Sequence, residues 1–389
     1  MPQRTHVLIG SHDLKPLDPI EFRGNRHGSD VWQVRMRTLH GGRSEGVQVI
    51  EIENGAISID VLPTRGMGIW RVRRGDATLG WKAPACQPVH PCLVPLMEPA
   101  GLGWLDGFNE LLCRCGLESN GPPEFDDAGR LLRPLHGRIA NTPAHRVELL
   151  IDEDLGRLTV RGIVDESRFH FQTLRLTSSI STSIGSSEFT WADEAENIGG
   201  RDATMQMLYH FNIGQPLLRA GSQITAPIGT VAPHTKVAAE SGIATWNKMP
   251  PSQPGSSEQV FVLNLAADKS DNTGVLVSNL SNDEAVSLRF NKASLPCFTV
   301  WRNPPAETDG YVLGIEPATN YPNPRSFEMR HGRVVELKPG ERWQAEVTAK
   351  WLSDASAIAQ ERAAIEAIQG ARKPELVAAP RTDWSASAG

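Results

Sequence analysis

The sequence predicts an all-β protein built as a sandwich of antiparallel strands, and three observations lead to this prediction. The 389 residues include 35 Gly and 28 Pro, which are spread along the chain rather than gathered in one linker. Turn formers at this density are typical of many short strands joined by turns. Short apolar or alternating segments recur between the turns, and no regular helix separates them, which disfavours βαβ units and a parallel sheet. Hydrophobic residues make up 40% of the chain, enough for a large core.

The expected strands begin at residue 31, and Gly, Pro, Asn or Asp bounds each of them. They cover residues 31–38, 47–53, 56–62, 146–152, 157–164, 171–184, 187–197, 204–212, 259–266, 273–279, 285–290, 297–303, 311–316 and 341–351. We therefore expect one sandwich domain over 31–352, preceded by an N-terminal extension at 1–30.

Residues 92–134 interrupt this pattern with scattered Gly, Pro and Cys, and we expect a long loop insertion there with a short helix near Trp104 to Leu112. A loop of this length in a compact domain is usually functional. Its apolar composition suggests that it caps an edge or mouth of the sheet.

A helix is expected over 353–373 and a flexible tail over 374–389. Ser353 or Asp354 can cap the helix, three isoleucines (Ile358, Ile365, Ile368) share one face, and Gly370 lies where the helix should stop.

The charge balance favours a small neutral ligand. Lys and Arg number 39 against 45 Asp and Glu, a net charge of -6, which argues against nucleic acid or an acidic membrane surface as partner. The N-terminal segment has no apolar run long enough for a signal or spanning helix, so the expected location is cytoplasmic. The sequence leaves open whether the protein forms a homo-oligomer.

The five cysteines, an odd and scattered set, do not form a disulfide framework. Cys113 and Cys115 form a C-x-C pair, which is too sparse for a structural zinc site without a second pair nearby.

Glu316 is the first candidate catalytic residue, at the end of an expected strand beside Gly314 and before Pro317. A carboxylate on the inner or mouth face of a sandwich must be paired or used, because isolated burial is costly. The alternative is a structural Glu paired with an Arg at a strand end.

A second candidate group lies in the expected strand 204–212. Strand alternation places Gln206, His210 and Asn212 on one face, with apolar side chains on the other. A polar stripe across an apolar strand indicates a binding face, although a lone strand histidine can also be structural.

Three further segments supply candidate sugar-binding side chains. His136 and Arg138 flank Gly137, where the backbone can approach a ligand closely and a guanidinium can donate to vicinal hydroxyls. Arg65 stands between a strand and a glycine turn. The last segment offers a stacking ring, a donor and an orienting acid, namely Trp301, Arg302 and Asp309.

The sequence contains none of the motifs of other common enzyme classes: no nucleophile elbow, phosphate-binding loop, dinucleotide-binding fingerprint or zinc-protease helix is found. We expect no cofactor. A divalent metal held by histidines and Glu316 stays open as an alternative.

Four segments in this order, LPTRGMGI, LHGR, LYHFN and GIEPATN, resemble the aldose 1-epimerase (galactose mutarotase-like) superfamily, and within it a bacterial branch of DUF4432 type described only as a domain of unknown function. The resemblance runs from about Val31 to Trp351 and implies a β-supersandwich. It implies that Glu316 takes the proton of the anomeric hydroxyl and that His210 protonates the ring oxygen. It further implies that His136 and Arg65 bind sugar hydroxyls.

The chain departs from that family in two places. The aspartate that binds sugar hydroxyls in galactose mutarotases has no clear counterpart here, Asp309 being only a candidate, and the 92–134 insertion is foreign to those enzymes. The expected function is therefore a sugar 1-epimerase that acts without a cofactor. Two alternatives stay open: another isomerase or a lyase at the same site, with or without a metal, and a non-catalytic carbohydrate-binding protein.

Overall fold

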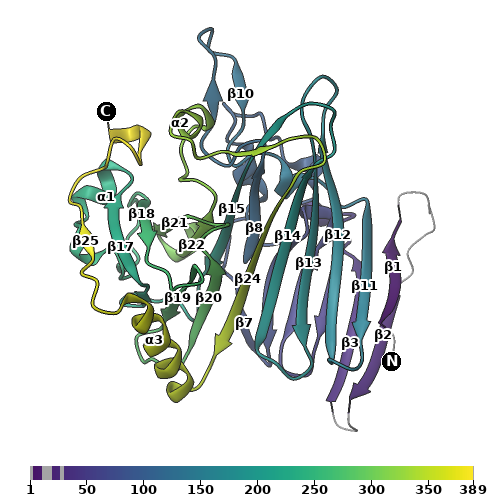
Figure 1. Cartoon of the computed structure of the whole chain (residues 1–389). Helices are drawn as coiled ribbons and strands as arrows, with labels where there is room; N and C mark the ends of the chain where they lie inside the picture. Colours follow the sequence, from purple (N-terminus) through teal and green to yellow (C-terminus); the bar gives the residue numbers. More distant parts are fainter. Residues whose placement is uncertain (1–2, 11–19, 27–29, 389) are drawn as a thin grey trace.

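Two large β-sheets packed face to face form the protein in the computed structural model, which describes residues 3–10, 20–26 and 30–388 (Figure 1). All pairings within both sheets are antiparallel except one short contact near the C-terminus. This confirms the predicted all-β sandwich of antiparallel strands. Within the described residues, no helix is long and apolar enough to cross a membrane.

The smaller sheet has nine strands. Their spatial order is β1 (Arg4–Ile9), β11 (Arg146–Asp152), β12 (Arg157–Ser167), β13 (Thr173–Ser183), β14 (Glu188–Asn197), β24 (Arg342–Leu352), β20 (Ala285–Asn291), β19 (Asn272–Ser278) and β16 (Gln223–Thr225).

The larger sheet carries the two candidate catalytic residues, His210 and Glu316. Its spatial order is β2 (Ile20–Arg26), β3 (Asp30–Thr38), β4 (Gln48–Glu53), β5 (Ser58–Leu62), β6 (Gly68–Arg74), β8 (Leu112–Leu117), β15 (Ala203–Ile213), β22 (Val312–Ala318), β21 (Cys297–Asn303), β18 (Gln259–Leu265), β17 (Ile228–Pro233) and β25 (Glu375–Leu376). Two short strands, β7 (Ala77–Leu79) and β23 (Val335–Leu337), pair outside this path, and a separate hairpin joins β9 (Glu124–Phe125) to β10 (Leu131–Arg133).

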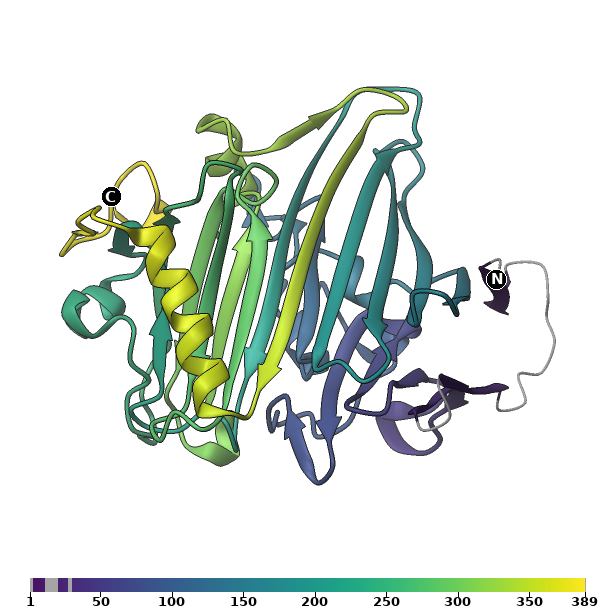
Figure 2. The same cartoon turned by 60° about the horizontal axis from the view of Figure 1, so that its bottom comes forward.

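The expected N-terminal extension contains two strands of the sandwich. β1 pairs with β11 and β2 pairs with β3, so the fold begins at Arg4 rather than near residue 31. β1 and the C-terminal segment lie at opposite ends of the molecule (Figures 1 and 2).

The expected loop insertion at 92–134 also contains a central strand. A 3₁₀ turn at Gly103–Gly107 stands where a short helix was expected, and β8 follows it and pairs with β15. Arg114 of β8 faces the core, where it donates to Asp193 of the other sheet from Nε at 2.5 Å and from Nη2 at 3.0 Å. Both side chains are fully buried, so this ion pair links the two sheets.

Three α-helices are present in the described residues: α1 (Lys236–Glu240), α2 (Arg325–Arg330) and α3 (Ala355–Gln369). Asp354 caps α3 by accepting from the Ala357 amide at 2.8 Å, and the buried Ile358 and Ile365 face the smaller sheet. Figure 2 shows α3 lying beside that sheet.

The two faces of β15 explain where the site lies. Met207, Tyr209 and Phe211 belong to the main core between the sheets, whereas Leu208 packs in a separate cluster with Trp104, as the predicted alternation requires. His210 shares the face of Leu208. His210 therefore lies on the face of the larger sheet that is turned away from the core.

Candidate active site

A cavity of about 400 Å³ opens over β15, β22 and β21 on this face. The 3₁₀ turn with its neighbouring loops and part of the C-terminal segment cover it. Its lining includes both predicted catalytic side chains, aromatic rings and three histidines: Trp104, Phe108, His136, His210, His234, Glu258, Thr299, Trp301, Glu316 and Ser387.

His210 presents one defined ring nitrogen to the cavity. Its Nδ1 lies 2.5 Å from Asn212 Oδ1, and the Asn212 amide nitrogen donates to the backbone oxygens of Glu110 at 3.0 Å and His210 at 3.1 Å. Since the amide nitrogen is committed to carbonyls, Oδ1 is the acceptor and Nδ1 of His210 carries the proton. Nε2 is thereby left to accept or donate a proton toward Glu316, whose Oε1 lies 3.2 Å away.

Glu316 reaches this position because its strand neighbour is a glycine. A Cβ at Gly314 would lie 2.5 Å from Glu316 Oε1, which is too close unless the carboxylate moves, and 3.2 Å from His210 Cε1, which is a tight contact. Glu316 is only 3% exposed, and its Oε1 receives no well-aligned hydrogen bond from any described residue. The carboxylate is therefore available to a substrate hydroxyl.

His136 enters the cavity from a tight turn. Its backbone has φ 56°, a left-handed conformation, and its Nδ1 donates to the Asn120 carbonyl at 2.8 Å. Gly137 follows with φ 72°, and a Cβ there would lie 2.2 Å from the Ser119 carbonyl. The turn brings the His136 ring within 5.6 Å of the His210 ring, centroid to centroid.

Burial shifts the pKa values of His210 and Glu316 away from their ordinary values. Burial lowers the pKa of His210 to about 3, and the charge of His136 acts in the same direction. Burial raises the pKa of Glu316 well above its ordinary value, and the charge of His136 opposes this only in part. These directions favour the shared proton on Glu316 rather than on His210, the arrangement in which both groups are neutral.

The positive charge of His136 depends on a neighbouring thiol. Burial is the largest influence on the pKa of His136 and lowers it, but the charge and hydrogen bonding of Cys115, together with the Asn120 carbonyl and the charge of Glu316, raise it to about 9. Burial raises the pKa of Cys115, but hydrogen bonding to Cys113 and the charge of His136 outweigh it and bring the pKa to about 6. The C-x-C pair thus lies behind the site on β8, with Cys115 beside His136.

Aromatic rings form the walls of the cavity. Trp104, Phe108 and Trp301 have ring centroids 6.3, 5.0 and 5.2 Å from that of His210. Trp301 is held by its Nε1, which donates to Glu258 Oε2 at 2.6 Å at the rim. Aromatic faces suit the apolar C–H faces of a sugar, as expected for Trp301.

Two of the other predicted residues hold the fold instead. Arg65 is buried away from the cavity and donates to Glu110 at 2.5 Å, to Asn141 at 2.7 Å and to two backbone carbonyls. Arg302 points to the opposite face from Trp301 and donates to the carbonyls of residues 245 and 248.

Three more predicted residues lie outside the cavity lining. Asp309 is exposed on a 3₁₀ turn, and Arg138 precedes the turn Ile139–Asn141. Gln206 is fully buried, and its amide has no hydrogen-bond partner among the described residues. Asn212 does not line the cavity either, and it affects the site through its hydrogen bond with His210 Nδ1.

The sequence analysis missed His234, Glu258 and Thr299, all of which line the cavity. Glu258 supplies a carboxylate at the rim, a role for which only Asp309 had been considered. Each of the three is a single polar residue without a local pattern to mark it: His234 follows β17, Glu258 precedes β18 and Thr299 lies within β21. Within the described residues, no three His, Cys, Asp or Glu side chains are grouped so as to hold a metal ion.

A family model for DUF4432, a domain of unknown function, matches residues 44–350. The chain belongs to the DUF4432 family. A solved structure from Klebsiella pneumoniae, described as that of a candidate aldose 1-epimerase, shares 31% identity with this DUF4432 protein and has a TM-score of 0.91. That alignment covers 96% of this chain and 98% of the other.

More distant structures show the same fold. A galactose mutarotase-like protein from Clostridium acetobutylicum is 14% identical with a TM-score of 0.56, covering 84% of this chain and 100% of that one. A galactose mutarotase related enzyme from Lactobacillus acidophilus is 13% identical with a TM-score of 0.54, covering 78% and 97%. A search of curated proteins finds no match to this DUF4432 protein.

Proposed function

We propose that this DUF4432 protein is an aldose 1-epimerase-type isomerase that interconverts the anomers of free sugars in the cytoplasm. The observation that carries the proposal is the 3.2 Å contact between His210 Nε2 and Glu316 Oε1 on the floor of an aromatic-walled cavity. Mutarotation requires one proton acceptor and one proton donor around the O5–C1–O1 unit, and a pair that shares one proton supplies both.

The proton balance of the reaction follows from this pair. In its ionised form, Glu316 takes the proton from the anomeric hydroxyl while His210 gives its Nε2 proton to the ring oxygen. The bond between C1 and the ring oxygen breaks, and an open-chain aldehyde forms. Rotation about C1–C2 presents the other face of the carbonyl, and the reverse transfers close the ring as the second anomer.

The pair is therefore in one protonation state before the ring opens and in the other after it has opened. The ionised pair reacts with the cyclic sugar, and the neutral pair remains beside the open chain. Because burial favours the neutral pair, a proton must pass from Glu316 to His210 before a cyclic sugar reacts. The direct contact provides the path for this transfer, and the mechanism uses no cofactor.

The test is an exchange measurement by NMR saturation transfer over a panel of aldoses, ketoses, uronates and keto-sugars. The parent protein should accelerate exchange between anomers of at least one aldose. Glu316→Gln and His210→Asn should each lower that rate by about 10²–10⁴-fold, the usual contribution of a positioned acid or base.

The surface pair His40 and Glu45, with Nδ1 and Oε1 3.0 Å apart, offers a matched control. His40→Asn and Glu45→Gln remove the same chemistry at an exposed position and should leave the rate unchanged. Anomer exchange that is equally fast in all four variants would reject the proposed pair. Conversion of a ketose or uronate instead would favour another isomerase or a lyase, and binding without conversion would favour a carbohydrate-binding protein.

A further inference from the structure

The cavity extends well beyond the catalytic pair. His234, which follows directly after β17, lines it together with Thr235, Pro322 and Ser387. β17 lies three strands away from β22 in the sheet order β22-β21-β18-β17. With about 4.8 Å between neighbouring strands, the strands bearing Glu316 and His234 are roughly 14 Å apart.

His234 is held in one orientation and one tautomer. Its Nε2 lies 2.9 Å from Asn323 Oδ1, and the Asn323 amide nitrogen donates to Glu328 Oε1 at 2.7 Å and to the Trp384 carbonyl at 2.9 Å. Oδ1 is therefore the acceptor, and Nε2 of His234 carries the proton. Burial lowers the pKa of His234, so the ring is neutral and its Nδ1 is an acceptor.

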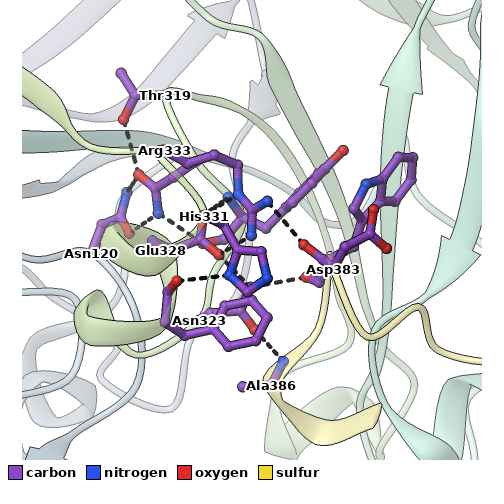
Figure 3. A network of polar contacts seen from close by, with 12 residues as sticks. Asn120, Thr319, Asn323, Glu328, His331, Arg333, Asp383 and Ala386 are labelled. Atoms are coloured by element: carbon purple, nitrogen blue, oxygen red, sulfur yellow. Dashed lines mark hydrogen bonds and ion pairs between the residues drawn. The ribbon is translucent and has the colours of Figure 1, made fainter.

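The C-terminal segment Asp383–Ser387 packs over His234, although residues 374–389 were expected to form a flexible tail. The Ser385 hydroxyl donates to the His234 carbonyl at 2.6 Å, and the Ala386 amide donates to Asn323 Oδ1 at 2.8 Å. Arg333, itself paired with Glu328, donates to the Asp383 carbonyl at 2.9 Å. Figure 3 shows Asn323, Glu328 and Arg333 meeting Asp383 and Ala386 in this network. The segment thereby fixes Ser387 at the mouth of the cavity.

A second polar group lies between His234 and the catalytic pair. Thr299 of β21 is paired in register with Glu316 of β22 and lines the cavity. It is 1% exposed, and its hydroxyl has no hydrogen-bond partner among the described residues. A buried hydroxyl without a partner is costly, and a ligand hydroxyl would satisfy it.

We infer that His234 and Thr299, enclosed by the Asp383–Ser387 segment, form a second subsite that binds hydroxyls of a sugar unit beyond the one that reacts. The inference rests on the proposed function, because it places the reacting C1 at Glu316 and His210. The described residues that line the cavity include neither Lys nor Arg, and the positively charged His136 lies beside His210 at the reacting end, whereas Glu258 stands at the rim. Among the described residues, the part of the cavity lined by His234 and Thr299 therefore offers a phosphate or carboxylate group no cationic side chain to pair with. The substrate class is a neutral reducing disaccharide.

The test compares D-glucose and D-galactose with maltose and lactose, using the full chain and anomer exchange by NMR. At least one disaccharide should have a kcat/KM about tenfold or more above that of its reducing monosaccharide. His234→Ala should lower the disaccharide kcat/KM by about tenfold, through KM rather than kcat, and leave the monosaccharide values unchanged. Thr299→Val, which keeps the side-chain shape, should act in the same direction.

His331→Ala is the matched control, since this histidine lies in the same region but does not line the cavity; its Nδ1 lies 2.9 Å from the Phe327 carbonyl. It should change neither sugar class. Equal kcat/KM for both classes in the parent, or equal losses for both classes in His234→Ala and Thr299→Val, would overturn the subsite.

A binding titration by calorimetry with the same four sugars separates this proposal from the proposed function. Disaccharide binding that weakens in His234→Ala, in a parent protein that exchanges no anomers, would keep the subsite and reject the epimerase. A parent protein that binds none of the four sugars would reject the subsite.

Discussion

Gly314 leaves no room for a Cβ beside Glu316: a methyl group there would lie 2.5 Å from the carboxylate Oε1. The glycine is therefore part of the geometry that lets Glu316 and His210 meet. The Trp301 ring lies 3.2 Å from the same Cβ position, so a methyl group there would press on both neighbours and require the Glu316 carboxylate to shift.

Gly314→Ala should consequently lower the anomer-exchange rate by about 100-fold, because displacing a catalytic group by about 1 Å has an effect of that size. The fold should persist, which circular dichroism can verify. Gly200→Ala is the control, since its Cβ would meet nothing within 4 Å. An active Gly314→Ala protein would show that the observed position of Glu316 is not needed.

Asn212 should set the tautomer of His210. Asn212→Ala removes the acceptor 2.5 Å from Nδ1, so the proton can move to Nε2 and the pair can no longer share one proton in the required arrangement. We expect a loss of kcat of about 10²-fold or more. ¹⁵N chemical shifts of the His210 ring should report the change of tautomer, and an unchanged tautomer would contradict this role.

Glu316 should reduce stability at neutral and alkaline pH. Its folded pKa is raised by burial, so the stability it contributes is fully present below its unfolded pKa and is lost as pH rises toward the folded value. Glu316→Gln imitates the protonated form and should raise Tm by about 2 °C or more at pH 8. The difference between the two proteins should shrink at pH 4, and a Tm gap that does not depend on pH would contradict the assignment.

Cys115 should control the charge of His136. Cys115→Ser removes the ionisable neighbour that raises the His136 pKa to about 9, and burial, which lowers that pKa, then dominates. The His136 pKa, followed by NMR titration, should fall below its ordinary value of about 6.5. Cys297→Ser, which changes another buried thiol not named among the causes of the His136 shift, should leave the pKa in place.

The predictable part of the site came from local strand patterns. Alternation along residues 204–212 and the expected strand that contains Glu316 both depend on neighbours within a few positions, and the structure brings His210 and Glu316 together. The expectation that this strand ends at Glu316 was wrong, because β22 continues through Pro317 to Ala318. Which face of the sheet became the cavity could not be read from either strand alone, because it depends on how the two sheets stack.

The residues that sequence reasoning misplaced depend on distant partners. Arg65 can be buried because Glu110, 45 positions away, accepts a hydrogen bond from its Nε. β8 was expected to be part of a loop because Gly, Pro and Cys are scattered around it, and the burial of its Arg114 depends on Asp193, 79 positions away. The tail was expected to be flexible, but backbone groups at Trp384 and Ala386 dock it on Asn323, and backbone groups carry no sequence signal.

Adjacent residues of β8 face the cavity and the core, which should couple the loss of activity to the unfolding of the sandwich. Cys115 faces the cavity cluster, while Arg114, the next residue on the strand, is clamped to the opposite sheet. This part of the site cannot unfold while the two sheets stay packed, because β8 contributes to the cavity and to the core between the sheets. In a denaturant titration, loss of enzymatic turnover and loss of global structure should therefore coincide in one cooperative transition, and amide protons of β8 should exchange with solvent only through complete unfolding.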